Sequence, residues 1–240
     1  MSRHSKWSTI KRQKGVADHK RGTQFTRLAN MITIAARQGL PDPTLNFKLR
    51  MAIEKARAAN MPKDNIERAI ARAKGTEGQA LEQCQYEIIG PGGVGLVVSV
   101  TTDNRNRTVS AIKAILKNFD ANLAGPNAVL WQFVQQGHLV VPLPSTKEER
   151  EALELVAIDA GCIDVDEHAD SLILTTEPHA LEQVKNTLTQ HHVTISEIGI
   201  GLQPNVTVPL TDQETERKLE NLIRDLEAID EVDEVVTNAI

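Results

Sequence analysis

The sequence pattern changes near residue 75, and this change limits the possible folds more than any other feature. Before it, apolar residues recur at helical spacing, as in Phe25, Leu28, Ala29 and Ile32, which is the pattern of a helix with one buried face. After it, short strand-like runs alternate with helical runs up to the C-terminus. We therefore expect an α+β protein with more than one domain.

The first segment predicts three helices from about residue 23. Gly39, followed by Pro41 and Pro43, ends the first helix, because glycine caps helices and proline cannot continue them. A second apolar face runs from Leu49 to Ala56, and Pro62 suits the first turn of a third helix, where its missing N–H needs no partner. The Lys and Arg residues fall at outward positions, which predicts a small basic three-helix domain over 23–78.

Charge divides the chain at the same place. Residues 1–75 hold 17 Lys and Arg against five Asp and Glu, a net charge of +12, whereas the other 165 residues carry −17. The overall charge of −5 hides this division. Such segregation indicates a polyanion-binding end attached to a body that the same polyanion repels.

Residues 1–22 are basic and have almost no apolar periodicity. We expect them to form a mobile tail that becomes ordered on a phosphate backbone. Trp7 lies between Lys6 and Lys11, which suits an aromatic that stacks on bases. The alternatives are a solvated tail with Trp7 packed on the helices, or a transit peptide.

The remaining residues predict two domains, one inserted in the other. Residues 138–204 follow a β-α-β-β-α-β order, the split β-α-β or ferredoxin-like arrangement, and form an acidic inserted domain of net charge −9. Residues 79–137 together with 205–240 are expected to form a discontinuous α/β middle domain. At the junction of the two domains we predict two separate strands, Val129–Val134 of the middle domain and Leu139–Val141 of the inserted domain, with a turn at 135–138 between them.

The motifs of catalytic and cofactor sites are absent or out of context. Gly90–Gly95 matches G-x-G-x-x-G, but a strand follows it, whereas a dinucleotide site needs a helix there. The acidic run 164–170 lacks a second ligand group with metal spacing. We therefore expect no enzyme, no metal and no cofactor.

Composition places the chain in a broad class. No run approaches the ~20 apolar residues of a membrane span, and the basic N-terminus lacks the apolar core of a secretory signal. Cys84 and Cys162 make neither a disulfide framework nor a zinc motif. These features favour a soluble protein of the reducing cytoplasm with no membrane partner.

Several separated motifs resemble the YebC/PmpR family. They are His4-Ser5-Lys6-Trp7, the run from Asp42 to Ile70 with Asn60-Met61-Pro62-Lys63-Asp64-Asn65, Gly90-Pro91-Gly92-Gly93, and Asp103-Asn104-Arg105-Asn106-Arg107-Thr108. The resemblance is dense to about residue 108 and looser afterwards. The family's own start coincides with Met1, so we expect no added transit peptide. The sequence departs from the family at 120–129, where relatives usually have a Gly pair before Asn-Leu-Gly and then Gly-Ser-Val.

The resemblance implies a helical N-terminal domain and two α/β domains, one inserted in the other. It implies two competing functions. Some bacterial members are described as DNA-binding transcriptional regulators. Others are associated with ribosomes and relieve stalling at proline-rich stretches, and a mitochondrial relative is a translational activator. In either reading the partner is nucleic acid, duplex DNA or ribosomal RNA. The candidate contact residues are Arg3, His4, Lys6, Trp7, Lys11, Arg12, Lys14, Lys20, Arg21, Arg105 and Arg107.

Arg105 and Arg107 need a separate explanation. They fall on the predicted first turn of a helix in an otherwise acidic body, where a cation opposes the helix dipole. Two compensating roles are open: pairing with carboxylates of the same domain, or contact with a partner or nucleic acid.

Overall fold

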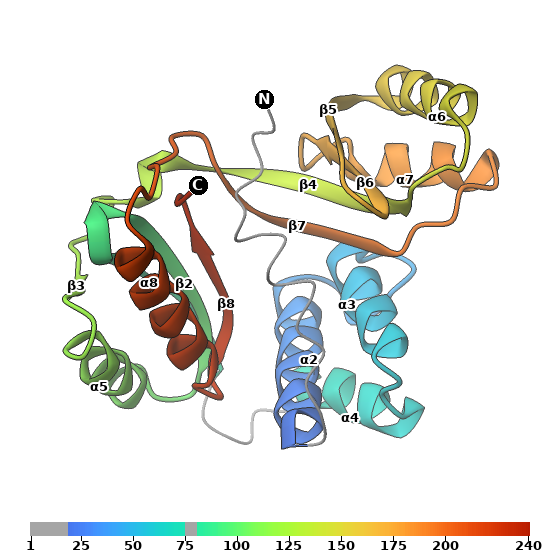
Figure 1. Cartoon of the computed structure of the whole chain (residues 1–240). Helices are drawn as coiled ribbons and strands as arrows, with labels where there is room; N and C mark the ends of the chain where they lie inside the picture. Colours follow the sequence, from blue (N-terminus) through green and yellow to red (C-terminus); the bar gives the residue numbers. More distant parts are fainter. Residues whose placement is uncertain (1–18, 75–80) are drawn as a thin grey trace. The chain divides into compact units, whose positions relative to one another are not determined.

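A computed structural model describes residues 19–74 and 81–240 (Figure 1). The described chain contains seven α-helices and two four-stranded antiparallel sheets, which confirms the expected α+β class. None of the helices in the described ranges is long and apolar enough to cross a membrane. The predicted tail falls largely on residues 1–18, outside the described residues.

The three expected helices are present in the N-terminal part. They are α2 (His19–Gln38), α3 (Phe47–Ala58) and α4 (Lys63–Lys74). The helix α2 therefore begins four residues before the predicted position. One apolar cluster joins the three helices, with Ile32, Leu49 and Ala56 fully buried. The helical spacing read from the sequence thus identifies the buried face of each helix.

Two buried polar side chains fix the helices to one another. Asn46 caps α3 by accepting from the Leu49 N–H at 3.0 Å, and its amide donates to the Ala35 and Leu40 carbonyls at 2.8 and 2.9 Å. Thr33 donates to the Ala69 carbonyl at 2.9 Å. These bonds satisfy groups that would be expensive to bury unpaired.

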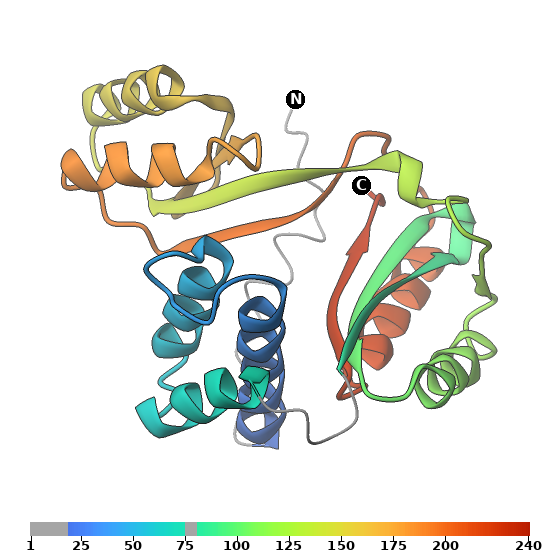
Figure 2. The same cartoon turned by 180° about the vertical axis from the view of Figure 1, so that it is seen from behind.

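The first sheet has the strand order β3-β1-β2-β8. The strand β2 is buried along almost its whole length, while α5 and α8 pack on one face of the sheet (Figures 1 and 2). Their apolar faces meet Leu96, Val98 and Val100 of β2 in one core cluster. The elements are β1 (Glu82–Ile89), β2 (Gly95–Thr102), α5 (Arg105–Leu116), β3 (Asn122–Leu123), α8 (Gln213–Glu227) and β8 (Val232–Thr237).

The loop that departs from the family, 120–129, is held by Glu87. Its carboxylate accepts from the backbone N–H groups of Asn127, Val129 and Leu130 at 2.5, 2.6 and 2.7 Å. Asp120 and Asn127 have positive φ angles of 52° and 65°, and both occupy positions where relatives usually have glycine. Asp and Asn are the side chains that tolerate this backbone region best. The loop therefore keeps its turns without those glycines.

The described chain divides into two compact units. One consists of Gln132–Val206, and the other of the described part of Lys6–Trp131 with Thr207–Ile240. The first unit has the sheet order β5-β6-β4-β7, which is the ferredoxin-like order expected from its β-α-β-β-α-β sequence. Its elements are β4 (Phe133–Pro142), α6 (Lys147–Ala160), β5 (Cys162–Glu167), β6 (Ser171–Thr176), α7 (Leu181–Gln190) and β7 (Glu197–Pro204).

One prediction about this unit was wrong. The expected turn at 135–138 does not exist, because Phe133–Pro142 is a single strand. Gly137 and His138 pair with β6 on one side and β7 on the other, so the sheet supplies hydrogen bonds that compensate for the weak strand propensity of Gln-Gln-Gly. Within the strand predicted at Val129–Val134, Leu130–Gln132 instead form a 3-10 helix.

Candidate nucleic-acid interface

Three exposed cations of the helical part lie at the surface of α3 and α4. Lys48, Arg57 and Arg72 are exposed, and within the described ranges no ion pair involves them. Lys63 differs, because it pairs with Glu67 at 3.4 Å. The apolar cluster on the inner faces of the same helices directs these charges outward, where a polyanion can reach them.

Most of the predicted contact residues fall outside this description. Arg3, His4, Lys6, Trp7, Lys11, Arg12 and Lys14 lie outside the described residues. Lys20 and Arg21 belong to the first turns of α2. Only Arg105 and Arg107 have described side chains, and both lie in the first turn of α5.

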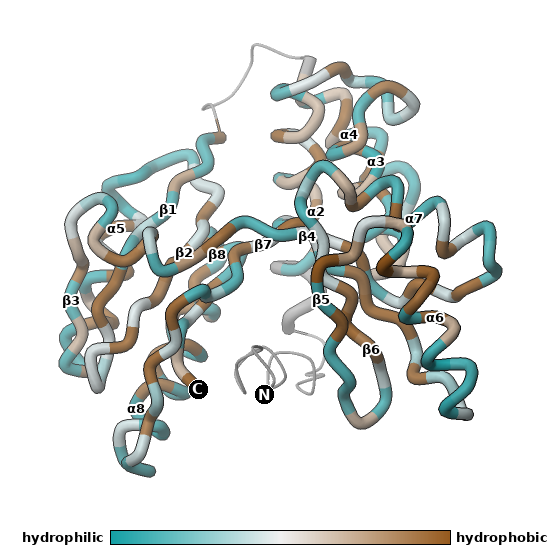
Figure 3. Tube along the Cα trace, turned by 90° about the horizontal axis from the view of Figure 1, so that it is seen from above, coloured by the Kyte–Doolittle hydropathy of each residue, from teal (hydrophilic) through white to brown (hydrophobic). Residues whose placement is uncertain are grey.

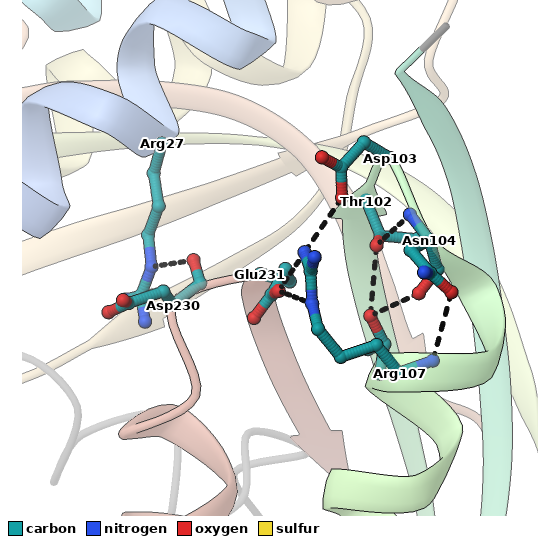
Figure 4. Close-up of polar contacts among 8 residues, drawn as sticks. Arg27, Thr102, Asp103, Asn104, Arg107, Asp230 and Glu231 are labelled. Carbon is teal, nitrogen blue, oxygen red and sulfur yellow. Dashed lines mark hydrogen bonds and ion pairs between the residues drawn. The ribbon is translucent and has the colours of Figure 1, made fainter. Parts of the chain in front are cut away.

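The turn before α5 explains why Arg107 sits on a first helical turn. Asn104 caps the helix by accepting from the Arg107 N–H at 3.1 Å, and the Thr108 hydroxyl donates to Thr102 Oγ1 at 2.9 Å. The Arg107 guanidinium pairs with Asp103 and with Glu231, each at 2.7 Å (Figure 4). Hydrogen bonds to Glu231 and Asp103 raise the pKa of Arg107, so the group stays a cation held between two carboxylates.

Arg105 also has an intramolecular partner. Its Nε lies 2.5 Å from a carboxylate oxygen of Glu82 on β1. The sequence left two roles open for these arginines: pairing with carboxylates of the same part of the chain, or contact with a partner. The structure pairs both with nearby carboxylates. Their side chains remain 61% and 55% exposed, so these ion pairs are surface pairs of the kind that contribute little each.

Arg27 of α2 makes a connection that the sequence did not reveal. Its guanidinium donates to the carbonyl oxygens of Glu227 and Ile229 at 2.7 and 2.8 Å, and to that of Asp230 at 3.3 Å (Figure 4). These carbonyls belong to the C-terminal end of α8 and the turn that follows, where a cation is favourable. Arg27 therefore ties the helical part to the first sheet and is not free for a ligand. Carbonyl acceptors leave no side-chain signature, so no sequence signal could have identified this contact.

The partly buried carboxylate of Asp233 lies near the same contact. Thr101 donates its hydroxyl to Asp233 Oδ2 at 2.6 Å. Burial raises the pKa of Asp233, although the Thr101 hydrogen bond and the charges of Arg27 and Lys55 act in the opposite direction. The basic side chains of the helical part thus influence the sheet electrostatically.

The described residues offer little for metal or thiol chemistry. Over 19–74 and 81–240, no group of three or more His, Cys, Asp or Glu side chains is placed to hold a metal ion. Burial raises the pKa of the Cys162 thiol to about 12, which makes it a poor nucleophile.

Two family models match the chain. Residues 5–76 match the model described as the TACO1/YebC protein N-terminal domain, and residues 81–239 match the TACO1/YebC second and third domain. The chain belongs to the TACO1/YebC family. The change of pattern near residue 75 therefore coincides with the boundary between the two family models.

Similar proteins cover almost the whole chain. A protein of Moorella thermoacetica is 44% identical over 241 residues, covering 100% of this chain and 95% of its own length. One of Petrotoga mobilis is 44% identical over 220 residues, covering 91% and 87%. Both are named probable transcriptional regulatory protein. The crystal structure of a conserved hypothetical protein of Aquifex aeolicus matches with a TM-score of 0.86 and 39% identity, covering 95% of this chain and 93% of that one.

Proposed function

We propose that this TACO1/YebC family member is a non-enzymatic, nucleic-acid-binding regulator of gene expression, with duplex DNA as its first candidate target. The names of its relatives support regulation of transcription. The contact surface in this proposal is the basic helical part together with residues 1–22. The acidic remainder, of net charge −17 after residue 75, points away from the polyanion because phosphates repel it.

The exposed cations without ion pairs carry this proposal. Lys48, Arg57 and Arg72 are held on rigid helices with no competing carboxylate in the described ranges. Neutralising phosphate releases condensed counterions, so each contact contributes about −0.9 to the log–log salt slope on duplex DNA. Arg105 and Arg107 already have carboxylate partners, and we place both outside the proposed contact surface.

The test is fluorescence anisotropy with a labelled duplex over a salt series. The triple variant Lys48→Glu, Arg57→Glu, Arg72→Glu should bind at least about 100-fold more weakly at 0.1 M salt, with a shallower salt slope. Single variants then map which side of α3 and α4 faces the phosphates. The matched control reverses Lys147 and Lys218, which are cations of the acidic part paired with Glu151 and Glu214. Equal loss in the control would refute a localised contact surface.

A second candidate is a ribosome-associated translation factor. Trp7 between Lys6 and Lys11 favours it, because an aromatic flanked by cations suits stacking on unpaired bases. Trp7→Ala should then weaken binding to single-stranded RNA more than binding to duplex DNA. Equal loss on both ligands would count against stacking.

Sedimentation of cell lysate distinguishes the two targets. Migration with ribosomal particles that resists DNase and is abolished by RNase supports the translation factor. Retention on genomic DNA at moderate salt, without migration with ribosomes, supports the transcriptional regulator. Lys6→Glu with Lys11→Glu should abolish whichever association is observed if the N-terminal residues take part in it.

A further inference from the structure

The outward side of α6 carries aliphatic side chains that do not belong to the core. Leu155 and Ile158 are 64% and 56% exposed and lie one helical turn apart. Ile163, on the edge strand β5 that follows, is 52% exposed. We call these three residues the α6 patch. They are three of the ten exposed large apolar side chains in the described chain, and they fall within nine consecutive residues.

The core of the acidic unit does not require these side chains. On the inner side of α6, Leu153, Ala157 and Ala160 are buried. A comparable helix, α8, buries Leu219, Leu222 and Leu226 and has no exposed large apolar residue. Apolar residues recur along α6 (Figure 3); some are buried and others are exposed, so only part of its apolar surface is used for folding. Clustered exposed apolar residues with a polar rim are typical of protein-binding surfaces.

The rim of the patch is acidic. Glu151 and Asp159 lie one turn before and one turn after Leu155, and Glu154 lies one turn before Ile158, which are the neighbouring positions on a helix. Glu151 pairs with Lys147, but within the described ranges Glu154 and Asp159 have no ion pair. The patch thus combines apolar contact area with uncompensated negative charge.

We propose that the α6 patch binds a basic segment of a partner protein, with apolar side chains between its lysines and arginines. The apolar side chains cover Leu155, Ile158 and Ile163, and the cations meet the acidic rim. Nucleic acid and anionic lipid are excluded as occupants because both carry the charge of the rim. This surface lies outside the basic helical part, so the proposal stands independently of nucleic-acid binding.

The experiment uses the full chain and a labelled amphipathic helical peptide with Leu on one face and Lys on the other. The peptide is about 14 residues, or four turns, long. We expect it to bind, and Leu155→Ser with Ile158→Ser to weaken binding about tenfold. Glu154→Lys with Asp159→Lys should weaken it as well. Both pairs replace exposed or half-buried side chains, and their thermal unfolding is compared with that of the wild type to confirm folding.

The control reverses two acids on the other unit, Glu220→Lys with Glu214→Lys on α8, and should leave peptide affinity unchanged. Equal affinity of the wild type and the serine variant would overturn the proposal, since binding would then reflect net charge alone. Tight binding of a Glu/Leu peptide of the same length would overturn it too. Sedimentation without peptide tests another occupant: dimerisation that the serine variant abolishes would assign the patch to a second copy of this chain.

Discussion

Arg57 on α3 and Arg107 on α5 are both exposed arginines within one turn of a helix end, and their surroundings differ. Arg57 is in the last turn of α3, where the helix dipole favours a cation without any partner. Arg107 is in the first turn of α5, where the dipole disfavours it, and Asp103 and Glu231 hold it. Arg107 is thus held by carboxylates beside the first sheet, whereas Arg57 has no ion pair among the described residues. An exposed charge therefore does not by itself identify a binding residue. It also matters whether the side chain is already paired within the chain.

Arg27 limits this comparison within the helical part. It is a cation of α2, but three carbonyl oxygens at the end of α8 occupy it. Within the helical part, Arg27 thus joins α2 to the end of α8, whereas Arg57 and Arg72 on α3 and α4 are exposed and have no ion pair in the described ranges.

The largest expected effect comes from removing the negative charge of Glu87, which accepts three backbone hydrogen bonds. Burial acts to raise the pKa of this carboxylate, but the N–H groups of Val129, Leu130 and Asn127 together lower it. Glu87→Gln should destabilise the first sheet and the loop at 120–129 by about 3 kcal/mol, because hydrogen bonds to a charged acceptor are lost in a buried site. Hydrogen exchange should accelerate at those three N–H groups. Glu82→Gln on the same strand, which removes one exposed ion pair, is the control and should change little.

The pH dependence of this contribution has a definite sign. A carboxylate whose folded pKa is lowered stabilises the protein above its unfolded pKa and loses that contribution as the pH falls through the folded value. The difference between wild type and Glu87→Gln should therefore be largest at neutral pH and shrink in acid. A difference that does not vary with pH would contradict the role of the charge.

The second prediction compares the two arginines directly. Arg107→Ala should lower the melting temperature only slightly but speed exchange in the first turn of α5, because Asp103 and Glu231 lose their shared cation. Its nucleic-acid affinity should stay unchanged. Arg57→Ala should do the opposite: affinity falls about tenfold at 0.1 M salt, and the melting temperature does not change. If Arg107→Ala also weakened binding, the contrast between the two regions would fail.

The sequence was sufficient where the physical cause was local. The sequence offers Asp103 or Asn104 as the cap of α5, and the structure uses Asn104; Pro62 immediately precedes α4. The sequence was insufficient where the conformation or role of a residue depends on a partner distant along the chain. Gln135–His138 reads as a turn until β6 and β7 pair with it. Glu87 and Asp233 look like ordinary surface acids, and only the loop and the strand that pack on them make them exceptional.

The smallest expected effect is at Asp233, where the two regions influence each other. The folded state favours the protonated carboxyl because burial raises its pKa. Its contribution is therefore complete below the unfolded pKa and is lost as the pH rises through the folded value. Asp233→Asn keeps an acceptor for the Thr101 hydroxyl but carries no charge, so it should raise the melting temperature by a few degrees at neutral pH, with the gain shrinking toward pH 4. A variant less stable than wild type at neutral pH would mean that Arg27 and Lys55 hold Asp233 as an ion-pair partner. Cations of the helical part would then be ion-pair partners of the first sheet, and the contrast between available cations on the helices and paired cations beside the sheet would no longer hold.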